Sequence, residues 1–397
     1  MGVNNSIEFN VIGGSMIGQR VLVKVLIVAR KFTCMAFALS VTSVSVANAG
    51  GYTITDIGAQ VGIYNISASS INNSGQMVGS SNVGQATLFR NGTITNLGAL
   101  GGYESVAYSI NNSGQVVGSS WGYGGTDEHA TLFSNGTVTD LGTLPGLTNS
   151  SAYSINNFGQ AVGYSYIPGT GPSRATLFSN GTVTDLGSLG GTYNGANSIN
   201  DSGQAVGYSY TAGNAGMHAT LFSGGKVTDL GTLGGYGSNG YRSTALSINN
   251  SGLAVGWSDF ENSSQHAALF SGGKVTDLGT LGGRASQAYS VNNSGQIVGV
   301  SNIDYSGASH AVLWSNGKAV DLTSLVYAAT GWTLMEARGI NDAGQIVGYG
   351  IKNDTTGLST AFLLTPDSAT PTPIPAAAWL MGSGLIGLAR FRRSLVF

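Results

Sequence analysis

Cysteine is almost absent from this chain. Cys34 is the only cysteine in 397 residues, and it lies in an N-terminal segment that we expect to be removed. The remaining chain can then form no disulfide, and it has no cysteine for a zinc site or for nucleophilic catalysis. An oxidising compartment is therefore tolerated.

Charged residues are also scarce, at 9% of the sequence, and they are unevenly distributed. The body between Gly50 and Pro375 holds 17 of the 18 acidic residues but only 9 of the 16 basic ones, a net charge of −8 with histidine neutral. Phosphate backbones are bound by basic patches. The acidic body thus disfavours nucleic acid as a partner.

Signatures of common catalytic sites are missing as well. We find no serine nucleophile elbow, no P-loop and no H-E-x-x-H, and no pair of residues stands out as general acid and base. The acidic residues outside the repeats described below are scattered in expected loops: Glu104, Asp127, Glu128, Asp259 and Glu261. We expect no catalytic residue, no metal and no cofactor, and a protein that is not an enzyme.

Residues 20–49 have the three parts of a secretory signal peptide. Basic residues from Arg20 to Lys31 precede a largely apolar run, 32–46, and the small-x-small sequence Ala47-Asn48-Ala49 follows. We expect signal peptidase to cleave at Ala47 and Ala49. The alternative is a retained anchor, but the run is short and rich in Ser and Thr for a membrane span.

The C-terminus has a proline-rich stretch, a short apolar run and a basic end. The stretch Pro371–Pro375 is followed by Ala376–Ala389 and by Arg390-Phe391-Arg392-Arg393. Fourteen helical residues span about 21 Å, less than a hydrocarbon core of roughly 30 Å, so this helix could anchor the chain only temporarily. The arginines would keep its end in the cytoplasm.

This tail resembles the PEP-CTERM sorting tail in its V-P-x-P-A variant. The motif stands here as Thr372-Pro373-Ile374-Pro375-Ala376, with Thr372 in place of the usual valine. The resemblance covers some 22 residues. It implies processing by an exosortase, an inner-membrane enzyme of exopolysaccharide-producing Gram-negative bacteria, whereas an ordinary C-terminal anchor is the alternative.

Internal repetition dominates the region between these ends. The pattern Ile/Val-Asn-Asn/Asp-x-Gly-x-x-Val-Gly occurs seven times, spaced by 39 to 49 residues, beginning at Ile71, Ile110, Ile155, Ile199, Ile248, Val291 and Ile340. A second pattern, Ala-x-Leu-Phe or a close variant, begins at Ala86, Ala130, Ala175, Ala219, Ala267, Ala311 and Ala361. A third pattern, Asp/Asn-Leu/Ile-Gly/Thr, begins at Asp56, Asn96, Asp140, Asp185, Asp229, Asp277 and Asp321.

Each repeat reads as four short antiparallel strands. Apolar and polar residues alternate within each piece, as in half-buried strands. Pairs such as Asn180-Gly181 and Gly224-Gly225 predict two-residue hairpin turns, because both central residues need a positive φ. Seven such units of about 44 residues predict a seven-bladed β-propeller, with a linear β-solenoid as the rival architecture.

The two ends of the repeat region favour a closed ring. The segment 52–58 matches the fourth strand of a unit, and 360–364 matches the third strand of a unit that lacks its fourth. Pairing these segments would close the ring and remove an exposed strand edge. A solenoid would gain nothing from complementary ends.

The body also resembles the HAF-repeat family of bacterial extracellular proteins over about 300 residues. The stretches His129 to Phe133, His218 to Phe222, His266 to Phe270 and His310 to Trp314 carry the His-Ala-Phe-like motif. The resemblance implies export and repetition and assigns no activity.

The repeated histidines and aspartates invite a metal-site hypothesis. Equivalent positions in a ring of seven lie too far apart to share a metal, and one carboxylate per repeat falls short of the six to eight oxygens that calcium takes. We expect His129, His218, His266 and His310 to form structural hydrogen bonds within blades. We expect the short side chains of Asp140, Asp185, Asp229, Asp277 and Asp321 to stabilise turns.

Aromatic residues in the variable loops indicate a binding surface, although packing between blades is an equal alternative. They are Trp121, Tyr123, Tyr166, Tyr193, Tyr210, Tyr236 and Tyr305.

We divide the chain into a leader and signal peptide (1–49), the propeller (50–366), a linker with the sorting motif (367–375) and the sorting helix (376–397).

These features together predict an exported, non-enzymatic protein of the cell surface or extracellular matrix. We expect a binding or structural role associated with exopolysaccharide or biofilm, with polysaccharide or another surface protein as the partner. The protein would be anchored transiently in the inner membrane. The alternative is a propeller-type glycan lyase or hydrolase that uses loop residues.

Overall fold

The computed structural model describes residues 51–367, apart from 63–65, 82–83, 123–126, 170, 235–241, 262–263, 316, 328–329 and 354–358. The signal cleavage site at Ala47 and Ala49, the sorting motif Thr372–Ala376 and the expected C-terminal helix lie outside the described residues. In the described part are strands β1 to β28, one short helix, α1 (Ile57–Val61), and the 3₁₀ turns η1 (Ala212–Asn214) and η3 (Leu322–Leu325). This part of the chain is all-β, as predicted.

Twenty of these strands form five separate four-stranded antiparallel sheets. In four of the sheets the strands pair in chain order. They are β2 (Ser67–Ile71), β3 (Met77–Ser80), β4 (Ala86–Arg90) and β5 (Thr93–Asn96); β6 (Ser105–Ile110), β7 (Val116–Trp121), β8 (Glu128–Ser134) and β9 (Thr137–Asp140); β18 (Ser243–Ile248), β19 (Ala254–Asp259), β20 (Gln265–Ser271) and β21 (Lys274–Asp277); and β22 (Ser286–Val291), β23 (Ile297–Asn302), β24 (Ser309–Ser315) and β25 (Lys318–Asp321).

The fifth sheet joins the two ends of the repeat region. It has the order β1 (Tyr52–Asp56), β28 (Ser359–Pro366), β27 (Ile346–Lys352) and β26 (Trp332–Ile340). Tyr52 pairs with Pro366, and Asp56 pairs with Phe362. The predicted pairing of the first and last strands is therefore confirmed, although residues 57 and 58 belong to α1 instead of the strand.

The other eight strands form one continuous sheet. They are β10 (Asn149–Ile155), β11 (Ala161–Tyr166), β12 (Ser173–Ser179), β13 (Thr182–Asp185), β14 (Gly190–Ile199), β15 (Ala205–Thr211), β16 (Met217–Ser223) and β17 (Lys226–Gly231). The prediction of seven separate four-stranded sheets fails in this region. Because β14 is ten residues long, its first residues reach β12, where Ser173 and Tyr193 form a parallel bridge.

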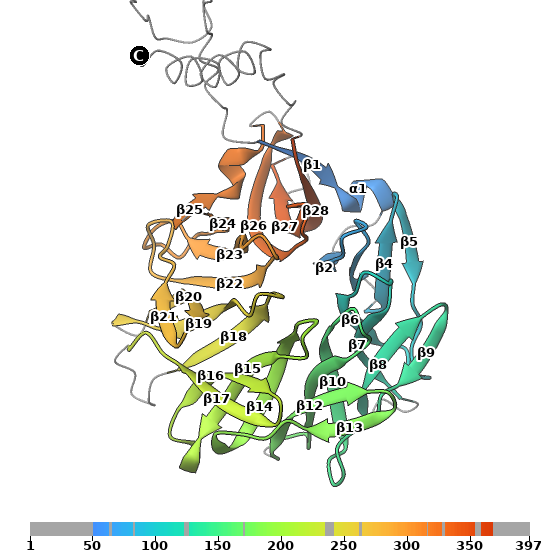
Figure 1. Ribbon diagram of the computed structural model, residues 1–397. Helices are drawn as coiled ribbons and strands as arrows, with labels where there is room; N and C mark the ends of the chain where they lie inside the picture. The colour runs from blue at the N-terminus through green and yellow to red at the C-terminus, as the bar shows by residue number, and fades with distance from the viewer. Residues whose placement is uncertain are drawn as a thin grey trace, which may run out of the picture. The chain divides into compact units, whose positions relative to one another are not determined.

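The sheets lie around a common centre in the arrangement of a β-propeller (Figure 1). The first strand of each repeat contacts the first strand of the next one, and β26 contacts β2. The apolar core lies between neighbouring sheets. Val78 and Ala86 of one sheet, for example, pack against Ala107, Ile110 and Phe133 of the next. Each sheet therefore depends on its neighbours to bury its apolar side chains.

A β-bulge in each first strand explains the glycine of the repeated Val-Gly pair. The register of β10 shifts between Ala152 and Ser154, which leaves Tyr153 as the extra residue. This bend brings the Ser151 carbonyl to Gly163, where a Cβ would lie only 1.8 Å from that oxygen. The corresponding distances at the other six glycines are 1.7 to 2.0 Å, so only glycine fits there.

Seven buried asparagines connect the repeats near the centre. Each side-chain amide donates to the backbone carbonyl of its counterpart in the next repeat at 3.0 to 3.1 Å, through Asn72, Asn111, Asn156, Asn200, Asn249, Asn292, Asn341 and back to Asn72. Each side-chain oxygen accepts backbone N–H groups of its own turn, as Asn156 does from Phe158 and Gln160. The asparagines thus hold the turns and the ring together.

A candidate binding pocket lined by tyrosines

Two positions of the repeat vary while the residues around them stay nearly constant. The first is the bulge residue of the first strand: Ser69, Tyr108, Tyr153, Asn197, Leu246, Tyr289 and Arg338. The second directly follows the Val-Gly pair: Ser80, Ser119, Tyr164, Tyr208, Trp257, Val300 and Tyr349. At these two positions the side chain differs in size and polarity from repeat to repeat.

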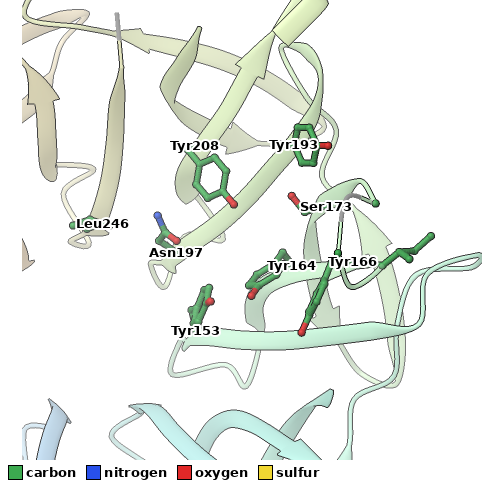
Figure 2. Close-up of a pocket in the computed structure, with 11 residues that line it drawn as sticks. Tyr153, Tyr164, Tyr166, Ser173, Tyr193, Asn197, Tyr208 and Leu246 are labelled. Atoms are coloured by element: carbon green, nitrogen blue, oxygen red, sulfur yellow. The ribbon is translucent and has the colours of Figure 1, made fainter. Parts of the chain in front are cut away.

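These variable positions line a cavity of about 560 Å³ between β10–β12 and β14, β15 and β18. Three bulge residues and both adjacent tyrosines contribute to its wall. The lining residues are Tyr153, Tyr164, Tyr166, Ile167, Gly169, Gly171, Ser173, Tyr193, Asn197, Tyr208 and Leu246. Figure 2 shows Tyr153, Tyr164, Tyr208 and Asn197 from neighbouring strands around this space. We call this cavity the tyrosine pocket.

The pocket opens on the side of the sheets away from the asparagine turns. Ile167, Gly169 and Gly171 lie in the loop between β11 and β12, at the opposite end of β11 from the turn that contains Asn156. The asparagine side has a smaller cavity of about 210 Å³, lined by the repeated turn residues.

The tyrosine rings support one another. Tyr108 meets Tyr153 edge-on with 5.0 Å between ring centroids, Tyr153 lies 5.4 Å from Tyr164, and Tyr164 lies 5.0 Å from Tyr166. The Tyr166 hydroxyl donates to Glu128 Oε2 at 2.5 Å. Such contacts fix the orientation of the rings before a ligand arrives, which lowers the entropic cost of binding.

The phenols of the pocket stay protonated. Burial raises the pKa of Tyr153, Tyr164 and Tyr208 above the usual value of 10.0. Burial also raises the pKa of Tyr166, and the Glu128 carboxylate beside it adds to the effect. At neutral pH the pocket therefore offers uncharged hydroxyl groups that can donate and accept hydrogen bonds.

The structure places the four repeated histidines away from this pocket, between the third and fourth strands of their repeats. His129 Nδ1 lies 2.7 Å from Asp140 Oδ2, and the same contact joins His218 to Asp229 at 2.7 Å. The remaining contacts of this type are His266 with Asp277 at 2.9 Å, His310 with Asp321 at 2.6 Å and Arg174 with Asp185 at 2.9 Å.

The second oxygen of each aspartate holds a turn. Asp140 Oδ1 accepts the N–H of Gly142 at 2.7 Å, and the other four aspartates accept the N–H two residues later at 2.7 to 2.8 Å. Burial raises the pKa of Asp277, but hydrogen bonds from His266 and Gly279 outweigh this effect and lower it. Among the described residues, no three His, Cys, Asp or Glu side chains gather as metal ligands.

Of the aromatic residues expected in loops, four lie in strands instead: Trp121 in β7, Tyr166 in β11, Tyr193 in β14 and Tyr210 in β15. Tyr166 and Tyr193 line the pocket, and Tyr210 packs against Tyr193 with 5.8 Å between centroids. Tyr305 lies under the Arg284 guanidinium at 5.3 Å, outside the pocket. Tyr123 and Tyr236 fall outside the described residues.

Sequence reasoning missed Tyr153, Tyr164 and Tyr208 because they lie within strands. The signal that identifies them is the variation between repeats at two fixed positions.

Sequence reasoning also overlooked that Gly118–Gly122 matches the G-x-S-x-G pattern of a serine nucleophile elbow. The central Ser120 is fully buried within β7, where its hydroxyl donates to the Glu104 carbonyl, so the geometry is not that of a nucleophile elbow.

The acidic residues of the expected loops do not form a common cluster with a base. Asp259 is buried and pairs with Arg242 at 3.0 Å, while Glu128 accepts the Tyr166 hydroxyl. No charged side chain contributes to the described lining of the tyrosine pocket. The site can stack on an apolar face and hydrogen-bond a polar rim, but it offers no carboxylate pair for hydrolysis.

A β-propeller with an uncharged aromatic pocket is the class that this fold and site define. No family model matches the chain, and no curated protein matches it. Solved structures similar to it include a protein assigned as TolB from Agrobacterium tumefaciens (14% identity, 58% of this chain and 88% of that one, TM-score 0.40) and TolB from Acinetobacter baumannii (12%, 78% and 67%, 0.39). A third is a protein assigned as an oxidoreductase (glucose dehydrogenase) from Thermus thermophilus (10%, 79% and 100%, 0.34). With TM-scores of 0.40 and below, these likenesses carry no conclusion about this chain.

Proposed function

We propose that this protein is an exported, non-enzymatic propeller that binds a glycan in the tyrosine pocket. The observation that carries the proposal is the pocket itself, with its five tyrosines and the polar groups of Ser173 and Asn197. A pyranose ring has an apolar face of C–H bonds and a rim of hydroxyls. Aromatic faces with neutral hydroxyl groups complement both parts.

We also propose that the eight-stranded sheet acts as two blades, which makes the ring sevenfold. β10–β13 and β14–β17 are each antiparallel meanders, and one parallel bridge between Ser173 and Tyr193 joins them. Each meander also contributes its own asparagine, Asn156 or Asn200, to the central ring.

The two ends of the chain support a proposed route to the cell surface. Signal peptidase would remove the leader at Ala49, and the segment 376–397 would anchor the chain transiently in the inner membrane. An exosortase would then process the tail at Thr372–Ala376. In the described part of the chain, no helix is long and apolar enough to cross a membrane. Intact-mass analysis of matrix protein tests the route, and a mass that still includes 376–397 would contradict it.

The resemblances of the tail and repeats favour a glycan of the extracellular matrix or biofilm as the partner, or another surface protein. A glycan-acting enzyme is the second candidate. The uncharged lining of the pocket favours binding over hydrolysis, because a hydrolase needs a general acid and a base or nucleophile at the bond it cleaves.

A glycan array probed with residues 50–367 tests the proposed function. We expect binding to a restricted set of glycans, and we expect it to be lost in Tyr164→Ala combined with Tyr208→Ala. Each glycan that binds is then incubated with the protein and analysed for shortened or unsaturated products. Products would support the enzyme, and an empty array would contradict glycan binding.

A further inference from the structure

Arg338 occupies the bulge position in the last repeat. In other repeats this position holds Tyr153, Asn197 and Leu246, which all line the tyrosine pocket. Because the first strands of successive repeats contact one another around one centre, the bulge residues occupy equivalent places around it, which we call the rim. Arg338 is the one cation at this position in the seven repeats. It therefore differs from the other rim residues in the ligand chemistry it offers.

The Arg338 guanidinium is oriented by two neighbours on its own sheet. One terminal nitrogen lies 2.7 Å from Glu336 Oε2, and the guanidinium carbon lies 5.7 Å from the centre of the Tyr349 ring. The Tyr349 hydroxyl donates to Glu336 Oε1 at 3.2 Å. These contacts engage one edge and one face of the guanidinium, while 46% of the Arg338 side chain stays exposed.

A second tyrosine occupies the bulge position of the neighbouring repeat. Tyr289 is the bulge residue of β22, the strand that contacts β26. Burial, followed by the Glu336 charge, raises the pKa of Tyr289 to about 12. At neutral pH its hydroxyl is therefore protonated and can donate a hydrogen bond.

We propose that Arg338, Tyr289 and Tyr349 form a subsite for a carboxylate, so that the bound glycan contains an acidic sugar. This inference rests on the proposed glycan binding. A planar guanidinium binds a carboxylate through two parallel N–H donors, and neighbouring phenols can donate to the same oxygens.

The surrounding charges narrow the class of glycan. Glu336 offsets the charge of Arg338, and the body between Gly50 and Pro375 has a net charge of −8. A densely charged polyanion would be repelled by this body, although salt screens such repulsion beyond about 8 Å at physiological ionic strength. The subsite therefore fits a largely neutral chain with isolated uronic-acid residues.

Calorimetry with a matched pair of ligands tests this subsite. One ligand is an oligosaccharide of neutral hexoses with one uronic-acid residue, and the other is the same compound with its carboxylate reduced to an alcohol. We expect the acidic form to bind the wild-type protein about tenfold more tightly, which corresponds to about 1.4 kcal/mol. In Arg338→Gln the two forms should bind equally.

The controls separate this subsite from the proposed function. Arg174→Gln, at an exposed arginine paired with Asp185 on another part of the repeat, should keep the preference. If Arg338→Gln fails to fold, Arg338→Lys serves in its place and should show a reduced preference, because an ammonium lacks the planar donor pair.

Three outcomes would overturn the subsite. They are equal binding of both forms by the wild type, tighter binding of the reduced form, and a preference that survives in Arg338→Gln. If one of these outcomes is found while Tyr164→Ala still weakens binding of the reduced form about tenfold, the glycan function stands and only the acidic subsite fails. Binding of neither form contradicts both proposals.

Discussion

Asn341 and Asn72 are 269 residues apart in the sequence, and the side-chain amide of Asn341 donates to the backbone carbonyl of Asn72 at 3.0 Å. Equivalent bonds join all the remaining pairs of successive repeats, so the last repeat contacts the first in the same way as any two neighbours. Pairing of Tyr52–Asp56 with β28 closes the same junction at the sheet edge. Two independent devices thus hold the ring closed.

Removal of the closing strand should open the ring. Deleting residues 51–56 exposes the edge of β28, whose unpaired N–H and carbonyl groups can then pair with another chain. We expect a melting temperature lower by several degrees and the appearance of oligomers in size-exclusion chromatography. An unchanged melting temperature with a clean monomer would show that β1 is dispensable for closure.

Loss of one central asparagine should be costly. Asn156→Ala removes the acceptor for the N–H groups of Phe158 and Gln160 and the donor to the Asn200 carbonyl. Unsatisfied buried groups of this kind cost about 1–3 kcal/mol each, so we expect a loss of about 3 kcal/mol in the free energy of unfolding. Chemical denaturation measures it.

Asn135→Gly is the matched control for Asn156→Ala. Asn135 is an exposed hairpin residue with a φ of 52°, and the corresponding residues Gly224 and Gly272 show that glycine suits this place. A change near zero is expected. Similar losses in both variants would argue against a special role for the central asparagines.

The glycine of the Val-Gly pair should not tolerate a methyl group. Gly163→Ala places a Cβ 1.8 Å from the Ser151 carbonyl oxygen, and both atoms belong to paired strands that cannot move apart freely. We expect a loss of roughly 3 kcal/mol or more, or no folded protein. Gly122→Ala, where the nearest atom lies at 3.9 Å, should fold normally. Equal tolerance at both sites would contradict the bulge geometry.

Acid should weaken the hydrogen bonds that Asp201 and Asp342 accept from asparagines of neighbouring turns. Burial raises the pKa of Asp201, but hydrogen bonds from Asn157 and Asn250 outweigh it and lower the pKa; bonds from Asn293 and Asn73 do the same for Asp342. A lowered folded-state pKa means that this stabilisation is present above the unfolded value of about 3.9 and is lost as pH falls through the folded value.

Melting curves between pH 7 and pH 3 measure this effect. The double variant Asp201→Asn/Asp342→Asn, which copies the asparagine of the other repeats, should lose less stability on acidification than the wild type. Asp127→Asn, at an exposed loop position, should behave as the wild type does. Parallel curves for all three proteins would exclude the two carboxylates as the source of acid sensitivity.

Local patterns in the sequence were sufficient for much of the fold. The alternation of residues predicted the strands, and the positive φ of Asn180 and Gly181 confirms one of the predicted hairpins. The complementary ends predicted the pairing of β1 with β28. The joining of β12 to β14 was not predictable, because Gly190–Tyr193 reads as a loop and becomes strand only beside its neighbour.

The candidate site was less accessible from the sequence. Tyr166 and Tyr193 were identified as loop aromatics, but Tyr153 sits at a bulge whose existence depends on strand pairing. The side-chain bonds of the central asparagines could not be predicted from the repeat pattern, because the bonds from Asn72 to Asn111 and onward exist only when repeats pack together. Strand pairing within a repeat determines the bulge, and contacts between repeats determine the asparagine bonds.

Glycan binding by the tyrosine pocket is tested most directly by calorimetric titration of one array-positive oligosaccharide into three proteins. The wild type should bind it, and Tyr164→Ala should bind about tenfold more weakly, since loss of one aromatic contact of about 1.4 kcal/mol has this effect. Tyr103→Ala, which removes a tyrosine that is 91% exposed and outside the pocket, should bind as the wild type does. Equal affinity in all three proteins would contradict the account.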